Sequence, residues 1–365
     1  MKYNIDPELA LISKIKMPGN PKLLPLINRA IRLFKCESDE KVTVKKYRLR
    51  GYEKAEIFAR VIEPKQVENP EKPLPCLVFF HGGGFMLKAS GGHYKIAKEY
   101  AYRVPCKVVY VDYRLAPEYP FPTPVEDCFA TYQWVLKYAD RLGVDKNNIF
   151  LGGDSAGGNL AAAVTLMARD RKLPKPKGVL LIYPVTDRRM NTESMQRFTD
   201  TPVWDAKLSK MMWQCYLGDR EPWPVEYASP VEAKSFKKFP PTYMEVAEFD
   251  CLHDEGVNLY EKMKAAGVAA ELHEVKGGCH GYETAINSLL MQNCLNLRIE
   301  WIKKTMEGGH GLYRRVTKAY RSSANSDAGR MRHGFKRKEA AVVTKKGGQR
   351  LLGVSRWGSR TWGKL

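Results

Sequence analysis

The sequence from Leu74 to Lys304 alternates short apolar runs with longer stretches of helical periodicity. Six runs are rich in Val, Ile, Leu and Phe: LPCLVFF, CKVVYV, NIFLGG, GVLLIY, PTYMEV and AELHEV. Strands that are apolar throughout are typical of a sheet buried on both faces, and the helical stretches between them supply the cover. The alternation therefore predicts an α/β fold with a mostly parallel sheet and helices on both faces.

Three segments depart from this alternation. KVTVKKYRLR and AEIFARVIEP, separated by GYEK, predict a β-hairpin before the first buried strand. Residues 1–40 contain apolar positions at helical spacing interrupted by prolines, which predicts short amphipathic helices. An insertion at residues 185–235, between two predicted strands, holds the helical run VWDAKLSKMMWQCYLGD, which is rich in Met and Trp.

The positive charge of the chain is concentrated at its C-terminal end. Residues 308–365 carry 15 lysines and arginines against Asp327 and Glu339, so they hold +13 of the formal net charge of +20. This basic, Gly- and Ser-containing segment lacks periodic apolar residues, which predicts a disordered tail. Four interpretations stay open: a solvated or appended extension, an arm for anionic surfaces or nucleic acid, a partner-docking segment, and an extra folded element.

Several classes of protein lack support in the sequence. No apolar run reaches the ~18 residues of a membrane span, and the first twenty residues lack the apolar core of a signal peptide. The eight cysteines form no CxxC pair, and the seven histidines show no metal-ligand spacing. We therefore expect a cytoplasmic protein with reduced thiols, no metal, no cofactor and no obligate nucleic acid; a homodimer stays open.

The stretch GGDSAGG places Ser155 between the predicted strand NIFLGG and the predicted helix NLAAAVTLMA. This arrangement is the GxSxG nucleophile elbow, in which Gly153 and Gly157 let the backbone turn sharply and leave the serine oxygen exposed. A phosphate-binding loop would need GxxxxGK[ST] or GxGxxG, and neither is present here. A turn that the glycines merely relax is the alternative interpretation.

A second glycine cluster, HGGGF, directly follows the predicted strand LVFF. Such a loop can direct backbone N–H groups at an oxyanion, as the HGGG motif does. The expected donors are the N–H groups of Gly83, Gly84 and Ala156. His81 is expected to brace this loop, and a glycine turn that serves only packing is the alternative.

A serine nucleophile needs a base, and His280 is the candidate because it lies in the loop after the last predicted strand. His253 and His273 lie at a helix start and inside a strand, and His81 and His93 precede the serine, against the order Ser, acid, His.

The orienting acid is expected where the strand PTYMEV ends. Asp250 is the first candidate there, Glu248 lies two positions away, and Asp187 after LLIYPVT is the second choice. Asp254 is expected to cap the following helix.

The motifs HGGGF, VDYRLAPEYPFPTPVEDC, GDSAGGN, YASP, FDCLHDEG and HGY together resemble the hormone-sensitive-lipase-like, GDSAG-type bacterial carboxylesterases of the α/β-hydrolase superfamily. The resemblance implies an eight-stranded sheet in a core of residues 41–184 and 221–307. It implies a helical cap built from residues 1–40 and 185–220. It also implies Ser155, Asp250 and His280 as the triad, with Gly83, Gly84 and Ala156 as the oxyanion hole. Some relatives are receptors that have lost the histidine, which this chain retains.

The expected activity is a serine carboxylesterase acting on small-molecule esters of short to medium acyl chain through an acyl-enzyme. The alternatives are an acetyl esterase for decorated carbohydrate, an amide hydrolase, and a non-catalytic binding homologue. Four side chains are candidates for the substrate pocket, with ordinary helix core as the alternative: Phe85, Leu208, Met212 and Trp213.

Overall fold

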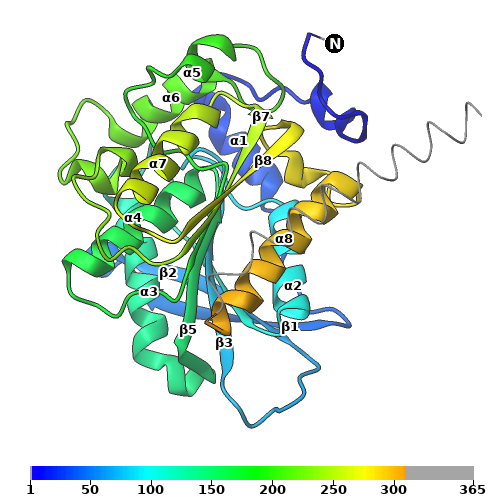
Figure 1. The fold of residues 1–365 in the computed structure, drawn as a ribbon, viewed down its shortest axis with the longest axis vertical. Coiled ribbons are helices and arrows are strands. Elements are labelled where there is room, and N and C mark those ends of the chain that lie inside the picture. The colour runs from blue at the N-terminus through cyan, green and yellow to red at the C-terminus, as the bar shows by residue number, and fades with distance from the viewer. Residues whose placement is uncertain (1, 309–365) are drawn as a thin grey trace, which may run out of the picture. The chain divides into compact units, whose positions relative to one another are not determined.

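The computed structural model describes residues 2–308, and the strands in that range form one eight-stranded sheet (Figure 1). Its order is β1-β2-β4-β3-β5-β6-β7-β8, and only β2 runs against the others. The predicted α/β fold with a mostly parallel eight-stranded sheet is confirmed. The strands are β1 (Val42–Arg50), β2 (Glu56–Pro64), β3 (Leu74–Phe80), β4 (Lys107–Asp112), β5 (Val144–Asp154), β6 (Val179–Ile182), β7 (Thr242–Phe249) and β8 (Ala270–Cys279).

Helices cover both faces of this sheet and bury two separate apolar layers (Figure 1). One layer packs beneath α3 (Thr123–Leu142), α4 (Ala156–Asp170) and α7 (His253–Ala265). The other packs beneath α2 (Gly91–Arg103) and α8 (Leu289–Met306). Because β3 to β8 are parallel, their carboxyl ends meet at one edge, and the loops that leave this edge can share a site.

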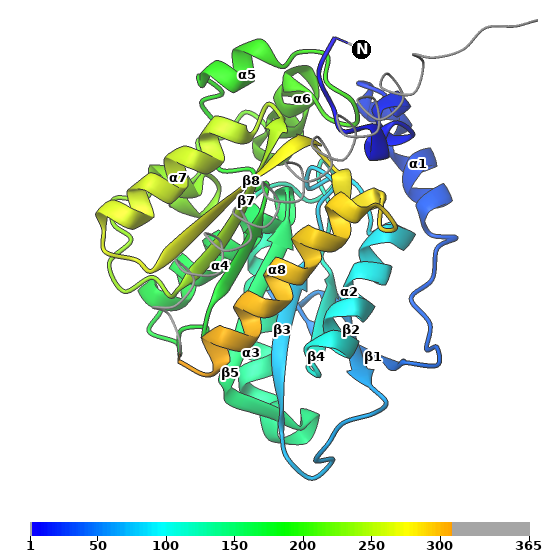
Figure 2. The ribbon, with the colours of Figure 1, turned by 45° about the vertical axis from the view of Figure 1, so that its right-hand side comes forward.

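Two segments far apart in the sequence lie beyond this edge, as Figure 2 shows. The first contains three 3₁₀ turns, η1 (Pro7–Leu9), η2 (Ile12–Lys14) and η3 (Pro21–Leu23), followed by α1 (Leu24–Ile31); the second contains α5 (Glu193–Arg197) and α6 (Ala206–Leu217). They touch where the Val203 N–H donates to the Ile15 carbonyl at 2.9 Å. Asn28 of α1 joins the loop after β3, since its amide donates to the Met86 carbonyl and accepts the Lys88 N–H, both at 2.8 Å.

The predicted hairpin is confirmed, because β1 and β2 pair antiparallel from Val42 opposite Pro64 to Arg50 opposite Glu56. The last helix begins later than its periodicity suggests. Tyr282–Thr284 forms a 3₁₀ turn, and Ser288 caps α8 by accepting the Met291 N–H at 3.1 Å. That turn is η7, and three further 3₁₀ turns complete the described secondary structure: η4 (Tyr52–Lys54), η5 (Val225–Tyr227) and η6 (Pro230–Glu232).

The eight cysteines are all free thiols, and all but the half-buried Cys215 are buried, as expected for reduced structural residues. Within residues 2–308 no helix is both long and apolar enough to cross a bilayer. The predicted tail at 308–365 lies outside the described residues from position 309 onward.

Candidate active site

Ser155 lies on the sharp turn between β5 and α4, with φ 54° and ψ −119°. Its backbone is fixed on both sides, because its N–H donates to the Ile182 carbonyl at 2.8 Å and its carbonyl accepts the Val185 N–H at 3.1 Å. A Cβ on Gly157 would lie 1.9 Å from the Phe80 carbonyl oxygen, so only glycine allows β3 to pass this closely. The sequence around Ser155 therefore holds a nucleophile-elbow geometry that a larger neighbour would break.

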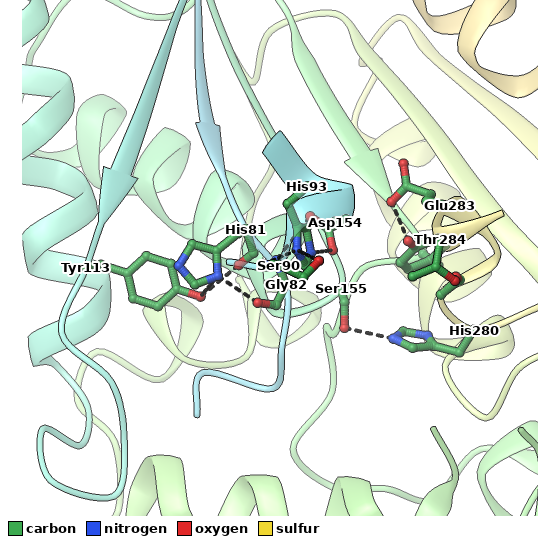
Figure 3. A network of polar contacts seen from close by, with 12 residues as sticks. His81, Gly82, Ser90, His93, Tyr113, Asp154, Ser155, His280, Glu283 and Thr284 are labelled. Carbon is green, nitrogen blue, oxygen red and sulfur yellow. Dashed lines mark hydrogen bonds and ion pairs between the residues drawn. The ribbon is translucent and has the colours of Figure 1, made fainter. Parts of the chain in front are cut away.

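Three side chains from three strand ends meet at this turn (Figure 3 shows Ser155 and His280). The Ser155 hydroxyl lies 3.0 Å from His280 Nε2, and His280 Nδ1 lies 2.7 Å from Asp250 Oδ2. Asp250 is fully buried, and its second oxygen accepts the Leu252 N–H at 3.0 Å. The structure thus brings together the serine, imidazole and carboxylate predicted from the sequence, in the arrangement that activates a hydroxyl.

The other acids considered from the sequence have different partners. Asp187 binds Arg189 through both carboxylate oxygens, and Glu248 accepts the Gly277 N–H at 2.8 Å. The prediction that Asp254 caps α7 is wrong, since that helix has no side-chain cap. Asp254 instead accepts the Ser194 N–H at 2.7 Å, so it ties α7 to α5.

The loop after β3 carries the predicted oxyanion donors. Gly83 and Gly84 have φ of 108° and 61°, a region that favours glycine, and their N–H groups donate to no acceptor among the described residues. Ala156 is the first residue of α4, so its N–H has no partner within the helix. A Cβ on Gly84 would lie 2.4 Å from the Trp204 ring, which covers this loop.

His81 is buried beside the loop. Its Nδ1–H donates to the Gly82 carbonyl at 2.8 Å, and its ring stacks on Tyr113 with centroids 4.4 Å apart. Tyr113 in turn donates its hydroxyl to the His81 carbonyl at 2.7 Å. Burial lowers the pKa of His81 to about 4, so the ring is neutral at pH 7, as suits a residue that braces the loop.

Asp154, next to the serine, joins the two glycine loops, a role that the sequence analysis missed. One oxygen accepts the Gly82 N–H at 3.0 Å and the other lies 3.2 Å from His93 Nε2 (Figure 3). The Ser90 N–H donates to His93 Nδ1 at 3.0 Å, which leaves Nε2 to donate to Asp154. Burial alone would raise the pKa of Asp154, but His93 and the Gly82 N–H outweigh it and hold this pKa below its usual range.

A buried ionic cluster supports the other side of His280. The Tyr183 ring lies 4.7 Å from the imidazole, and its hydroxyl donates to Glu283. Arg298 of α8 binds Glu283 and also Glu245, the latter at 2.6 Å. All members are buried, so each charge depends on its partners. The sequence offered one signal for this cluster, a single arginine among the apolar positions of the last helix.

A cavity of about 210 Å³ opens beside Ser155 and His280. Its wall is largely apolar, with side chains from the two segments beyond the sheet edge and from the loop and helix after β3: Met17, Ile31, Leu87, Ile96, Val203 and Trp204. The four side chains predicted for the substrate pocket are buried nearby, and none of them lines this cavity. Phe85 stacks flat on Tyr216 at 3.7 Å, and Leu208, Met212 and Trp213 pack in the core layer beneath the cap.

Across residues 2–308 no three His, Cys, Asp or Glu side chains lie together in a way that could hold a metal ion.

Comparisons with known proteins agree with this architecture. The family model described as the alpha/beta hydrolase fold matches residues 77–284, more than half of the chain. Esterase LipI of Mycobacterium tuberculosis is 33% identical over 57% of this chain and 65% of its own length, so the chain spans just under two thirds of that relative. Carboxylesterase NlhH of the same species is 35% identical over 62% of this chain and 71% of its own.

Among solved structures, a bacterial heroin esterase is 31% identical with a TM-score of 0.76, covering 83% of this chain and 98% of its own. The range matched by the family model contains both glycine loops and all three side chains that meet at the elbow. The predicted family is confirmed: the chain belongs to the hormone-sensitive-lipase-like carboxylesterases of the α/β-hydrolase superfamily.

Proposed function

We propose that the protein hydrolyses carboxylic esters of short to medium acyl chain, with Ser155 as nucleophile, His280 as general base and acid, and Asp250 as the carboxylate that orients the imidazole. One observation carries the proposal. The Ser155 hydroxyl, held at a strained turn, lies 3.0 Å from an imidazole whose other nitrogen lies 2.7 Å from a buried carboxylate. That chain of contacts is what acyl transfer by a serine requires.

In the first step the Ser155 oxygen attacks the ester carbonyl while His280 Nε2 accepts the hydroxyl proton. Asp250 accepts a hydrogen bond from the Nδ1–H of His280. This contact fixes the tautomer of the imidazole and stabilises the imidazolium that forms. The carbonyl oxygen becomes an alkoxide, and the N–H groups of Gly83, Gly84 and Ala156 are the donors that would receive it. His280 then returns its proton to the departing alcohol, and the acyl group stays on Ser155.

In the second step water attacks the acyl-enzyme. His280 accepts a proton from the water, the same donors hold the second oxyanion, and the acid leaves as the proton returns to Ser155. No cofactor is needed, because each step moves only protons and one acyl group.

The size of the cavity limits the acyl group. A volume of about 210 Å³ lies below the ~300–1,000 Å³ of pockets that take drug-sized ligands. Its largely apolar wall favours an alkyl chain over a sugar ring, because a sugar carries several hydroxyls and this wall offers few polar partners for them. A role for Phe85, Leu208, Met212 or Trp213 in substrate binding stays a prediction and would act through the packing of the cap.

The first test is Ser155→Ala, with exposed Ser235→Ala as the matched control. If the triad acts as a unit, Ser155→Ala should lower kcat by at least ~10⁴ on 4-nitrophenyl butyrate, and the control should match the unmutated protein. A fluorophosphonate probe should label the unmutated protein only at Ser155. A Ser155→Ala protein that keeps most of its activity contradicts the assignment.

The second test is a series of 4-nitrophenyl acetate, butyrate, octanoate and decanoate. We expect kcat/KM to peak at butyrate and to fall by decanoate. A maximum at decanoate would indicate a lipase-like site instead. Loss of both turnover and labelling in the folded protein would favour the non-catalytic binding homologue.

A further inference from the structure

Lys88 is a half-buried lysine in the wall of the active-site cavity, four residues after the second oxyanion glycine. Its backbone is held by α1, because its N–H donates to Asn28 at 2.8 Å. Besides the cavity at Ser155, it lines two neighbouring hollows of about 620 and 780 Å³. Lys88 therefore lies between the cavity at Ser155 and the two hollows that are bordered by residues of α1.

The other ionisable groups of the cavity wall already have charged partners. His93 contacts Asp154, His280 contacts Asp250, and Glu283 binds Arg298. The Lys88 ammonium makes no ion pair and no side-chain hydrogen bond with any residue between 2 and 308; charged groups act on it only at longer range. Among the described residues of this wall, Lys88 is thus the one charged side chain without a bonded partner of opposite charge.

Charges of both signs lie around Lys88, and neither of the nearby carboxylates is bonded to its ammonium. Burial, and then the nearby Arg32, lower the pKa of Lys88, with Asp112 and Glu118 acting in the opposite sense. The carboxylate of Asp112 is already engaged with Arg60 at 2.5 Å. Arg32 lines both neighbouring hollows and is itself exposed. A partly desolvated cation without a bonded counter-charge gains stabilisation from an anion that arrives with the substrate.

We propose that the active site takes esters that carry a carboxylate on one limb, and that Lys88 binds this carboxylate while Ser155 attacks the ester carbon. This inference rests on the proposed function and narrows its substrate class to half-esters of dicarboxylic acids or esters of hydroxy acids. The bound carboxylate is a spectator: it keeps its charge, and only the ester bond is broken.

The experiment compares charged and neutral esters of equal chain length in two arms. For a charge on the acyl limb, mono-4-nitrophenyl adipate is compared with 4-nitrophenyl hexanoate. For a charge on the alcohol limb, 4-acetoxybutanoate is compared with butyl acetate by acetate release. In each arm the readout is the ratio of kcat/KM for the charged ester to that for the neutral ester.

In at least one arm, the unmutated protein should hydrolyse the charged ester as fast as the neutral one. Lys88→Met should lower the charged-to-neutral ratio about tenfold or more, as expected for the loss of a charge-assisted contact. Lys88→Arg should keep most of the ratio, and Lys207→Met, which removes an exposed cap charge, should leave it unchanged. If Lys88→Met does not fold, Lys88→Gln provides the same comparison.

Two results would overturn the inference while the esterase assignment stands. One is a charged-to-neutral ratio below one tenth in both arms with normal turnover of the neutral esters. The other is a ratio that Lys88→Met changes by less than twofold. If neither ester of a pair is hydrolysed and a fluorophosphonate does not label Ser155, the proposed function itself fails.

Discussion

His81, in the loop after β3, links the stability of the folded protein to pH. In the unfolded chain a histidine has a pKa of about 6.5, whereas burial holds the pKa of His81 at about 4 in the folded protein. At a pH between about 4 and 6.5, the imidazole of His81 is protonated in the unfolded chain and neutral in the folded protein. The contribution of His81 to the free energy of unfolding is therefore highest above about pH 6.5 and decreases as the pH falls toward 4.

Replacing His81 by Asn should make the free energy of unfolding depend less on pH. Asparagine can still donate an N–H toward the Gly82 carbonyl, but it does not titrate. Between pH 4.5 and 6 the slope should be shallower than in the unmutated protein by up to one proton, about 1.4 kcal/mol per pH unit. Denaturant unfolding at several pH values measures this slope.

Tyr113→Phe is the control for His81. It removes the hydroxyl that binds the His81 carbonyl but keeps the stacked ring and the imidazole. We expect it to lower stability at every pH without changing the slope. A His81→Asn protein with the unmutated slope would mean that the ring can take up its proton while folded.

At the scale of elements, Asp154 connects three segments that are separate in the sequence: the end of β5, the loop after β3 and the start of α2. It ends β5, accepts an N–H from the loop after β3, and contacts His93 in the first turn of α2. The Gly82 bond fixes the start of the loop whose next two N–H groups are the proposed oxyanion donors. We therefore propose that Asp154 is a positioning residue, which acts on catalysis through the loop.

Asp154→Asn should lower kcat more than it raises KM. The amide keeps the size of the side chain but changes one acceptor into a donor, so either the Gly82 N–H or the His93 N–H loses its acceptor. We expect kcat to fall about tenfold to a hundredfold, less than the ~10²–10³ seen when an oxyanion donor is removed outright. Steady-state kinetics on 4-nitrophenyl butyrate measure both constants.

Asp140→Asn, at an exposed carboxylate on α3, is the matched control for Asp154 and should leave both constants unchanged. The thermal unfolding of Asp154→Asn should stay cooperative. If kcat and KM both match the unmutated protein, Asp154 does not position the loop.

The elements of this fold were predictable where local pattern determines them. Continuous apolar runs identified the buried strands, and the glycines around Ser155 identified the elbow because no other residue fits against the Phe80 carbonyl. The rule that parallel strands end at one edge placed Ser155, His280 and the candidate acids together, and the family resemblance implied Asp250 rather than Asp187 as the third member.

Contacts between distant elements were not predictable in the same way. Asp254 has the position of a helix cap in the sequence, yet its carboxylate binds the backbone of α5, sixty residues earlier. Leu208, Met212 and Trp213 have the composition of a pocket wall, but they are buried residues of α6 that pack into the core layer. Both outcomes depend on how the insertion folds back over the sheet, which the local pattern does not encode.

At the scale of the whole molecule, most of the net positive charge and the residues proposed for catalysis lie in different parts of the chain. The side chains proposed for catalysis lie between Gly83 and His280, whereas residues 308–365 hold +13 of the net +20. The last described helix ends at Met306, and the match to the family model ends at residue 284. The site should therefore operate without the C-terminal segment.

A chain ending at Gly308 should keep kcat/KM on 4-nitrophenyl butyrate within about twofold of the full chain and should elute from heparin at lower salt. The lower retention follows because the full chain presents 15 more cations, and each one neutralised on a polyanion adds to the salt dependence of binding. Equal elution of the two forms would remove the interpretation of the segment as an arm for anionic surfaces. A tenfold loss of kcat/KM on truncation would instead mean that residues after 308 contribute to the site, because the ester is neutral and gains nothing from distant charge.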